Sequence, residues 1–241
     1  MTLLRSALFN AWFFGLTFVM GVIGIAVRLI APQRVIDYAM LWARLVLGGL
    51  YRICGIRLVV IGAEHLPRDG AALIASQHRS AFDTLVWLTL VPRASYVLKR
   101  ELQRIPLFGP LLRPGGQIAI DRGAGAAALR SLLRGAERAA SEHRQIVIFP
   151  EGTRVAAGAN VALHPGVVAA AARLHLPVIP VATDSGRRWS RRAFRKHRGP
   201  IHLVVRPPLP AGLGRDELMR RLRQEWQAGE AAFGPVDKSV G

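Results

Sequence analysis

The chain has 241 residues, of which 51% are hydrophobic, and this composition excludes a disordered protein. Its 33 Lys and Arg residues against 15 Asp and Glu residues give a formal net charge of +18. That excess predicts an anionic partner, such as a phosphorylated substrate, an acidic membrane surface or nucleic acid. The single cysteine, Cys54, excludes an intramolecular disulfide and a cysteine-rich metal site, and it fits a reducing compartment.

An uncharged apolar run covers residues 6–27 and is bounded by Arg5 and Arg28. A helix of about 20 residues spans roughly 30 Å, which is the thickness of the hydrocarbon core of a bilayer. A secretory signal is the alternative, but its apolar part is usually only about 7–15 residues long. We therefore expect an uncleaved membrane anchor.

A second apolar segment, residues 35–54, follows after a short Pro-containing turn. Its polar residues Asp37, Arg44 and Tyr51 recur at roughly heptad spacing, which predicts a helix with one narrow polar stripe. The two helices form a hairpin in one leaflet, or the first crosses the membrane and the second lies flat. The sequence does not choose between these arrangements.

From about residue 57 the pattern changes to short apolar runs that alternate with helical stretches. This alternation predicts an α/β domain with a mostly parallel central sheet flanked by helices. The organisation that we expect is an N-terminal apolar two-helix membrane motif over residues 1–56, the α/β domain over 57–230 and a tail over 231–241. The predicted strands are 57–62, 72–76, 95–99, 116–121, 145–149, 177–182 and 201–205, and the predicted helices are 83–91, 124–141, 166–174 and 214–228.

The polar stretch "SQHRSAFDT" places His78 and Asp83 between two apolar runs. On one continuous helix these side chains would point about 140° apart, so they meet only if His78 precedes the helix and Asp83 lies in its first turn. Ser80 supports this placement, because Ser80 and Asp83 have the form of a capping box. Two interpretations stay open: Asp83 only completes a cap, or it orients His78 as a general base. No motif for a Ser or Cys nucleophile accompanies the pair, so the nucleophile would be a substrate hydroxyl.

Three further strand ends carry cations. Lys99 ends one predicted strand, Arg122 follows a second, and the turn "PEGTR" places Arg154 after a third. Open α/β sheets bind ligands at the carboxyl ends of their strands. Each cation alone could be an ordinary surface residue, but together with His78 they indicate chemistry on a hydroxyl of an anionic molecule.

Four blocks resemble, in order and spacing, the 1-acyl-glycerol-3-phosphate acyltransferase family, the lysophosphatidic acid acyltransferases. These are "HRSAFD", "KRELQRIPLFG", "GQIAIDR" and "FPEGTR", and with "LPVIPVA" the resemblance covers roughly residues 57–185. It implies that His78 is the general base and Asp83 its orienting partner. It also implies that Lys99 and Arg154 hold the acceptor's phosphate and that Arg122 helps to bind the acceptor. The acceptor site would be shaped by Glu151, Gly152 and Thr153.

The reaction implied by this resemblance is acyl transfer from acyl-CoA or acyl-ACP to the free sn-2 hydroxyl of 1-acyl-glycerol-3-phosphate, which gives phosphatidic acid. We expect no cofactor beyond this cosubstrate and no metal, because the histidines lack a ligand spacing such as H-E-x-x-H. His164 stands where the family often has lysine, so another lyso-lipid, such as a lyso-ornithine lipid or lysophosphatidylglycerol, is an alternative acceptor. A non-catalytic basic membrane-binding protein is the alternative outside enzymes.

A strongly basic segment, residues 186–199, contains Trp189 and Phe194 among its cations. We expect it to lie on an anionic membrane surface with both rings at the interface. A solvated loop, a site for the phosphates of coenzyme A or of carrier protein, and nucleic acid are the alternatives, but nucleic acid leaves residues 6–27 unexplained. The expected partners are membrane lipids, a lysophospholipid and no nucleic acid. The expected location is a bacterial inner membrane with the active site on its cytoplasmic side.

Overall fold

The computed structural model describes residues 1–156, 159 and 161–234. The helices are α1 (Thr2–Ile30), α2 (Val35–Cys54), α3 (Asp83–Leu90), α4 (Gly109–Leu112), α5 (Ala126–Ser141), α6 (Gly166–Leu174) and α7 (Arg215–Glu230). The strands are β1 (Ile56–Ile61), β2 (Ala72–Ser76), β3 (Ala94–Lys99), β4 (Ile118–Ile120), β5 (Gln145–Ile148), β6 (Val178–Thr183) and β7 (Gly199–Val205). The division into residues 1–56, 57–230 and 231–241 stays a prediction, and positions 235–241 of the predicted tail lie outside the described residues.

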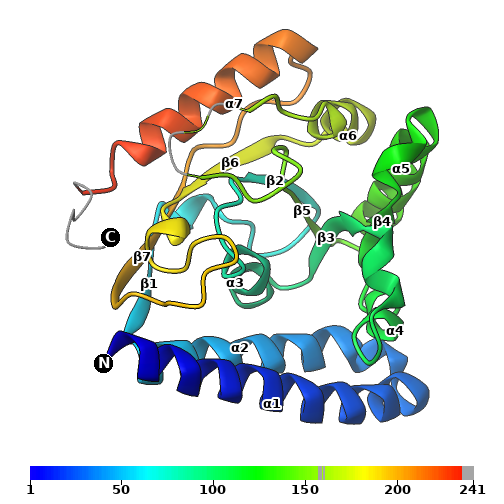
Figure 1. Ribbon diagram of the computed structural model, residues 1–241. Coiled ribbons are helices and arrows are strands. Elements are labelled where there is room, and N and C mark those ends of the chain that lie inside the picture. The colour runs from blue at the N-terminus through cyan, green and yellow to red at the C-terminus, as the bar shows by residue number, and fades with distance from the viewer. Residues whose placement is uncertain (157–158, 160, 235–241) are drawn as a thin grey trace.

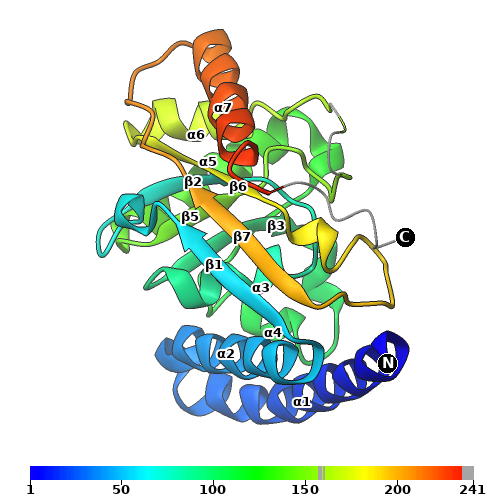
Figure 2. The ribbon, with the colours of Figure 1, turned by 90° about the vertical axis from the view of Figure 1, so that its left-hand side faces the viewer.

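The seven strands form one sheet in the order β1-β7-β6-β2-β5-β3-β4 (Figure 1). Neighbouring strands run parallel except β6 and β7, which are antiparallel. The predicted mostly parallel sheet is therefore confirmed. In the view of Figure 2, β1 and β7 lie side by side at the near edge of the sheet, between α2 on one side and α7 on the other.

Helices cover both faces of the sheet, and for this reason its central strands are apolar on both sides. Successive side chains of a strand point to opposite faces. Along β2, Leu73 and Ala75 pack into a core with side chains of α5, α6 and α7, whereas Ala72 and Ile74 pack into a second core with side chains of α2 and α3. The continuous apolar runs in the sequence thus correspond to strands that are buried on both faces.

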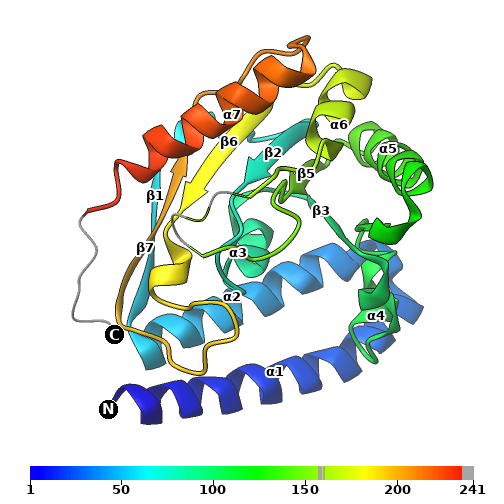
Figure 3. The same ribbon diagram turned by 45° about the horizontal axis from the view of Figure 1, so that its top comes forward.

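The two N-terminal helices lie side by side and antiparallel along one side of the domain (Figures 1 and 3). Polar groups on their facing sides bond to each other. Trp42 Nε1 donates to Thr17 Oγ1 at 3.1 Å, and the Tyr38 hydroxyl donates to the carbonyl oxygen of Met20 at 2.8 Å. These hydrogen bonds join the two helices of the predicted motif directly to each other.

α1 is long and apolar enough to cross a membrane, with a mean hydropathy of 2.2 in its most apolar window and only 11% of that window buried. Phe14 and Phe18 are among its exposed side chains. Phe9, in contrast, is fully buried and meets the ring of Trp189 edge-on at 5.6 Å. Trp189 therefore packs on α1, and the prediction that its ring lies at a membrane interface is wrong.

Candidate active site

One edge of the sheet collects the predicted functional residues. β2, β5, β3 and β4 are consecutive parallel strands, so their carboxyl ends lie next to one another. His78 follows β2, Glu151 and Arg154 follow β5, Lys99 ends β3 and Arg122 follows β4. Segments that are far apart in the sequence therefore reach the same edge, as the sequence predicts.

His78 and Asp83 form the predicted pair. His78 Nδ1 lies 3.1 Å from Asp83 Oδ2, and the same oxygen accepts the backbone N–H groups of Arg79 and Ser80 at 2.7 Å each. The position of Asp83 Oδ2 favours the tautomer of His78 that carries its proton on Nδ1, which leaves Nε2 as an acceptor. The imidazole ring also stacks on the ring of Phe149, with a centroid distance of 4.3 Å. Phe149 therefore contacts the face of the imidazole, and Asp83 contacts its edge.

The start of α3 differs in part from the predicted capping box. α3 begins at Asp83, and Ser80 Oγ accepts the N–H of Phe82 at 3.1 Å instead of the N–H of Asp83. The other half of the box is present, since Asp83 accepts the N–H of Ser80. Asp83 therefore completes the turn before the helix and also contacts His78, and the role of His78 as a general base stays a prediction. Among the described residues, Asp83 Oδ1 has no hydrogen-bond partner.

Glu151 holds the loop of His78 from the neighbouring strand. Its Oε2 accepts the backbone N–H of His78 at 2.6 Å, and its Oε1 accepts Nη1 of Arg79 at 2.7 Å. Both side chains are buried. Burial raises the pKa of Glu151 to about 7, while Arg79 and the His78 N–H act in the opposite direction. Because both carboxylate oxygens bond to the loop, Glu151 positions His78 rather than standing free for a substrate.

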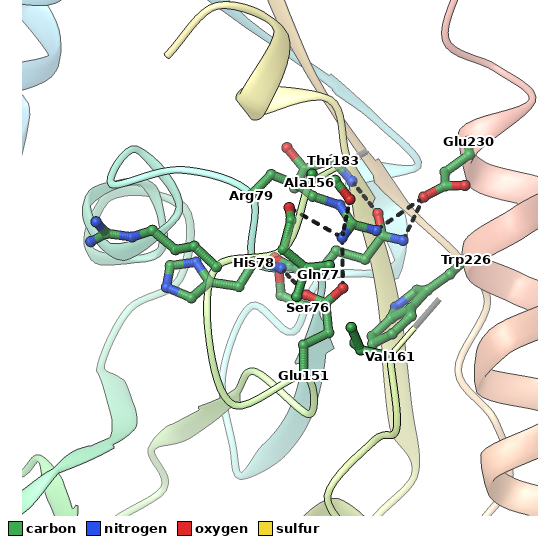
Figure 4. Close-up of polar contacts among 12 residues, drawn as sticks. Ser76, Gln77, His78, Arg79, Glu151, Ala156, Val161, Thr183, Trp226 and Glu230 are labelled. Carbon is green, nitrogen blue, oxygen red and sulfur yellow. Dashed lines mark hydrogen bonds and ion pairs between the residues drawn. The ribbon is translucent and has the colours of Figure 1, made fainter. Parts of the chain in front are cut away.

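The same loop is tied to the end of α7 (Figure 4). Glu230 Oε1 accepts Gln77 Nε2 at 2.7 Å and Arg79 Nη2 at 3.3 Å, and Gln77 Oε1 accepts the N–H of Thr183 on β6 at 3.1 Å. Sequence reasoning missed these residues. Gln77 and Arg79 flank His78 directly after a buried strand. Polar side chains at such a place could have indicated residues that hold the loop. Glu230 is 151 residues from Arg79, and no local pattern marks it.

Arg122 and Gly152 meet at the turn after β5. Arg122 Nη1 donates to the carbonyl oxygen of Gly152. Gly152 has a φ of +69°, and a Cβ at this position would lie 2.5 Å from the ring of His164. The turn therefore requires glycine, both for its backbone conformation and for the close approach of the imidazole. His164 thus lies at this same turn.

Arg154 lies beside the His78–Asp83 pair. Its neighbour Val155 donates its N–H to the carbonyl oxygen of His78 at 2.8 Å. Partial burial lowers the pKa of Arg154, and the charge of Asp83 opposes that change. The guanidinium is thus close enough to the pair to interact with it electrostatically, on the same edge of the sheet.

Lys99 and Thr153 reach this edge without a side-chain bond to the rest of the site. Both are exposed, and within the described part of the chain neither side chain forms a hydrogen bond or an ion pair. Lys99 pairs with Ile120 in the register of β3 and β4, and β3 is the strand next to β5. Its place at the site therefore follows from the strand order.

The described residues hold no group of three or more His, Cys, Asp and Glu side chains that could bind a metal ion. The expectation of a reaction without a metal or other cofactor stays a prediction. Cys54 is buried and free.

Comparison with known proteins gives a consistent result. The family described as Acyltransferase matches residues 57–184. The 1-acyl-sn-glycerol-3-phosphate acyltransferase of Pseudomonas aeruginosa is 32% identical over 214 residues, which cover 86% of this chain and 81% of that protein. The 1-acyl-sn-glycerol-3-phosphate acyltransferase alpha of Homo sapiens is 28% identical over 217 residues, which cover 89% of this chain and 75% of the human protein.

A solved structure shares the fold. The crystal structure of the 1-acyl-sn-glycerophosphate (LPA) acyltransferase PlsC from Thermotoga maritima superimposes with a TM-score of 0.79 at 20% identity, covering 99% of this chain and 100% of that one. The family match spans the four blocks at the sheet edge and the strands that carry them. The chain therefore belongs to the acyltransferase family and is an acyltransferase enzyme.

Proposed function

We propose that the protein transfers an acyl group from an acyl thioester, either acyl-CoA or acyl-ACP, to the free sn-2 hydroxyl of 1-acyl-glycerol-3-phosphate, which gives phosphatidic acid. The observation that carries this proposal is the contact between His78 and Asp83 at the edge where Arg154 lies. A general base next to a cation suits an acceptor whose hydroxyl is activated while its phosphate is bound. The printed names of the Pseudomonas and human relatives support this choice of acceptor.

In the proposed mechanism, Nε2 of His78 removes the proton of the sn-2 hydroxyl as its oxygen attacks the thioester carbonyl carbon. The tetrahedral intermediate collapses with cleavage of the C–S bond, and the leaving thiolate takes the proton from the imidazolium. Asp83 stabilises that imidazolium through its contact with Nδ1. General-base assistance of this kind is worth about 10²–10⁴-fold in rate.

The cations of the site bind the acceptor in this mechanism. Arg154 holds the phosphate, Lys99 contributes a second positive charge, and Arg122 positions the turn of Gly152 and Thr153 against the acceptor. The bond from Arg122 to the Gly152 carbonyl oxygen supports the last role. A guanidinium is well suited to the first, because its planar fork can donate two bonds to a phosphate.

The test is an assay of thioester-dependent conversion of lysophosphatidate to phosphatidate by the purified protein in detergent. We expect His78→Ala to lower kcat by about 10²–10⁴-fold, because the base is lost. The matched control is His65→Ala, which removes a histidine of the short helix Ala63–His65, an element that carries none of the proposed site residues. Near-wild-type turnover by the His78 variant would show that this residue is not the base.

A second acceptor is favoured by one observation, which is the presence of His164 at the turn of Gly152. A titratable imidazole replaces the permanent cation that the family often has there. This change favours an acceptor whose headgroup needs less positive charge in its binding site, such as a lyso-ornithine lipid. A panel of lysophosphatidate, lysophosphatidylglycerol and lyso-ornithine lipid decides between them, because the true acceptor is the one with the highest kcat/KM.

We also propose that the protein is bound to a membrane, with its active site on the cytoplasmic side of a bacterial inner membrane. The length and exposed apolar surface of α1 support the first part. The free thiol of Cys54 supports a reducing compartment. Acyl-CoA and acyl-ACP are substrates of that compartment, which supports the orientation.

A further inference from the structure

The segment of residues 186–199, here called the basic loop, is held on α1 by Lys196. The backbone N–H of Lys196 donates to Ser6 Oγ at 2.9 Å, and its Nζ donates to Asn10 Oδ1 at 2.5 Å. The ammonium also lies 5.1 Å from the ring centroid of Trp189 and 5.6 Å from those of Phe9 and Phe194. These are distances of cation–π contacts. This part of the basic loop is therefore not a solvated segment but a fixed bridge between α1 and the sheet domain.

The same loop reaches the active-site edge through Arg191. Arg191 Nη1 donates to the backbone carbonyl oxygen of Arg154 at 3.3 Å. Burial lowers the pKa of Arg154, Asp83 opposes this, and the charge of Arg191 lowers it further. Within the described part of the chain neither guanidinium forms an ion pair with a carboxylate. Two like charges are thus held near each other, and Asp83, the carboxylate that acts on Arg154, already accepts the backbone N–H groups of Arg79 and Ser80.

Such an arrangement is unfavourable by itself and becomes favourable when an anion binds between the charges. We propose that Arg154 and Arg191 together form a two-cation site for a phosphomonoester, and that Arg191 makes the enzyme prefer a phosphomonoester over a phosphodiester. This inference rests on the proposed function of the site. A phosphomonoester carries a charge of about −1.5 to −2 at pH 7 and has three acceptor oxygens, so it can engage both guanidinium groups. A phosphodiester carries only one negative charge.

Two substrates could supply the phosphomonoester: the lysophosphatidate headgroup and the 3′-phosphate of coenzyme A. The carbonyl bond ties Arg191 to the residue that we propose for the acceptor phosphate, and this favours the headgroup. The loop's attachment to α1 agrees with this, because α1 is the element with exposed apolar surface for a lipid.

The experiment compares the wild type with Arg191→Gln in nonionic detergent micelles, which removes any effect of an anionic membrane surface. We expect the KM for lysophosphatidate to rise about tenfold, with kcat within about twofold, because one charged contact to the ground state is lost. The KM for lysophosphatidylglycerol stays unchanged. Arg192→Gln and Arg195→Gln are the matched controls, since they remove the same charge from exposed positions of the same loop and leave both KM values unchanged.

The second arm identifies the source of the phosphate. If Arg191→Gln raises the KM for acyl-CoA but not for its analogue without the 3′-phosphate, and leaves the KM for lysophosphatidate unchanged, the two-cation site binds the donor. If no KM changes, or if the two control variants raise the KM for lysophosphatidate equally, the inference is overturned. Equal melting temperatures of all variants establish that the proteins are folded.

A third measurement separates this inference from the proposed function. Isothermal titration with glycerol 3-phosphate reports binding without turnover. We expect Arg191→Gln to weaken this binding about tenfold relative to the wild type and to Arg195→Gln. A wild-type protein that binds glycerol 3-phosphate through Arg191 but does not convert lysophosphatidate contradicts the proposed function alone. Equal binding by the wild type and Arg191→Gln contradicts the two-cation site alone.

Discussion

At the scale of single residues, Glu151 combines burial with two bonds to the loop of His78. Its pKa is raised to about 7 from an ordinary value of 4.5. The folded protein therefore holds this proton more tightly than the unfolded chain does. The resulting stabilisation is complete below about pH 4.5 and is lost as the pH rises through 7, and it amounts to about 3 kcal/mol at most.

We expect Glu151→Gln to remove this contribution, because an amide does not titrate. Between pH 4.5 and 7, the free energy of unfolding of the variant should fall less steeply with pH than that of the wild type. Urea unfolding in detergent at several pH values measures the two slopes. Glu137→Gln, which changes an exposed ion pair with Arg173 on the far face of the sheet, should keep the wild-type slope. Equal slopes for the wild type and Glu151→Gln would contradict the assignment.

At the scale of secondary-structure elements, the last residue of α7 supports the loop that carries His78. Glu230→Ala removes the shared acceptor of Gln77 and Arg79. We expect kcat to fall between about 10- and 100-fold, since small misplacements of a catalytic group have effects of that size. KM should change little, because Glu230 bonds to Gln77 and Arg79 and to none of the residues proposed to bind the acceptor.

The control for this prediction is Glu217→Ala on the same helix. Glu217 is paired with Arg220 and Arg221 on the helix surface, away from the loop. Steady-state kinetics of both variants in detergent give the comparison. A normal kcat for Glu230→Ala would mean that α7 does not position His78.

The two N-terminal helices offer a second prediction at this scale. A Cβ at Gly49 would lie 2.3 Å from Trp12 Nε1, whereas a Cβ at the preceding residue, Gly48, would meet only the flexible end of Arg52 at 3.4 Å. We expect Gly49→Leu to destabilise the protein by about 1–3 kcal/mol through overpacking, and Gly48→Leu to have a much smaller effect. Thermal unfolding in detergent measures both. Equal melting temperatures would show that the helices do not pack closely.

These elements also show which features a sequence can predict. The strands and helices are local patterns of apolar residues, so their positions and the meeting of His78 with Asp83 could be predicted. The contact of Glu230 with the loop could not, because it depends on how α7 packs across the sheet. The inward orientation of Trp189 has the same cause: an aromatic residue among arginines looks interfacial until a partner on α1 is known.

At the scale of the whole molecule, many of the exposed large apolar residues belong to α1. This helix lies along one side of the domain (Figure 3). We expect Phe18→Asp to reduce association with phospholipid vesicles at least about tenfold, because Phe18 is 65% exposed and a carboxylate is costly in an apolar membrane. Vesicle flotation after a high-salt wash measures the bound fraction.

The matched control for Phe18→Asp is Leu129→Asp. Leu129 is also exposed, at 40%, but it belongs to α5 on the opposite face of the sheet. This variant should bind vesicles like the wild type. Equal loss of binding by both variants would mean that α1 is not the membrane contact.

The bond between Gln77 and Glu230 joins residues 153 positions apart in the chain. A ribosome must therefore add most of the domain after Gln77 before the partner of this side chain exists. α1, in contrast, precedes Gln77 in the chain, so it is made before the loop and its partner on α7. A chain whose synthesis stops before residue 230 therefore lacks the carboxylate that holds the side chains of Gln77 and Arg79.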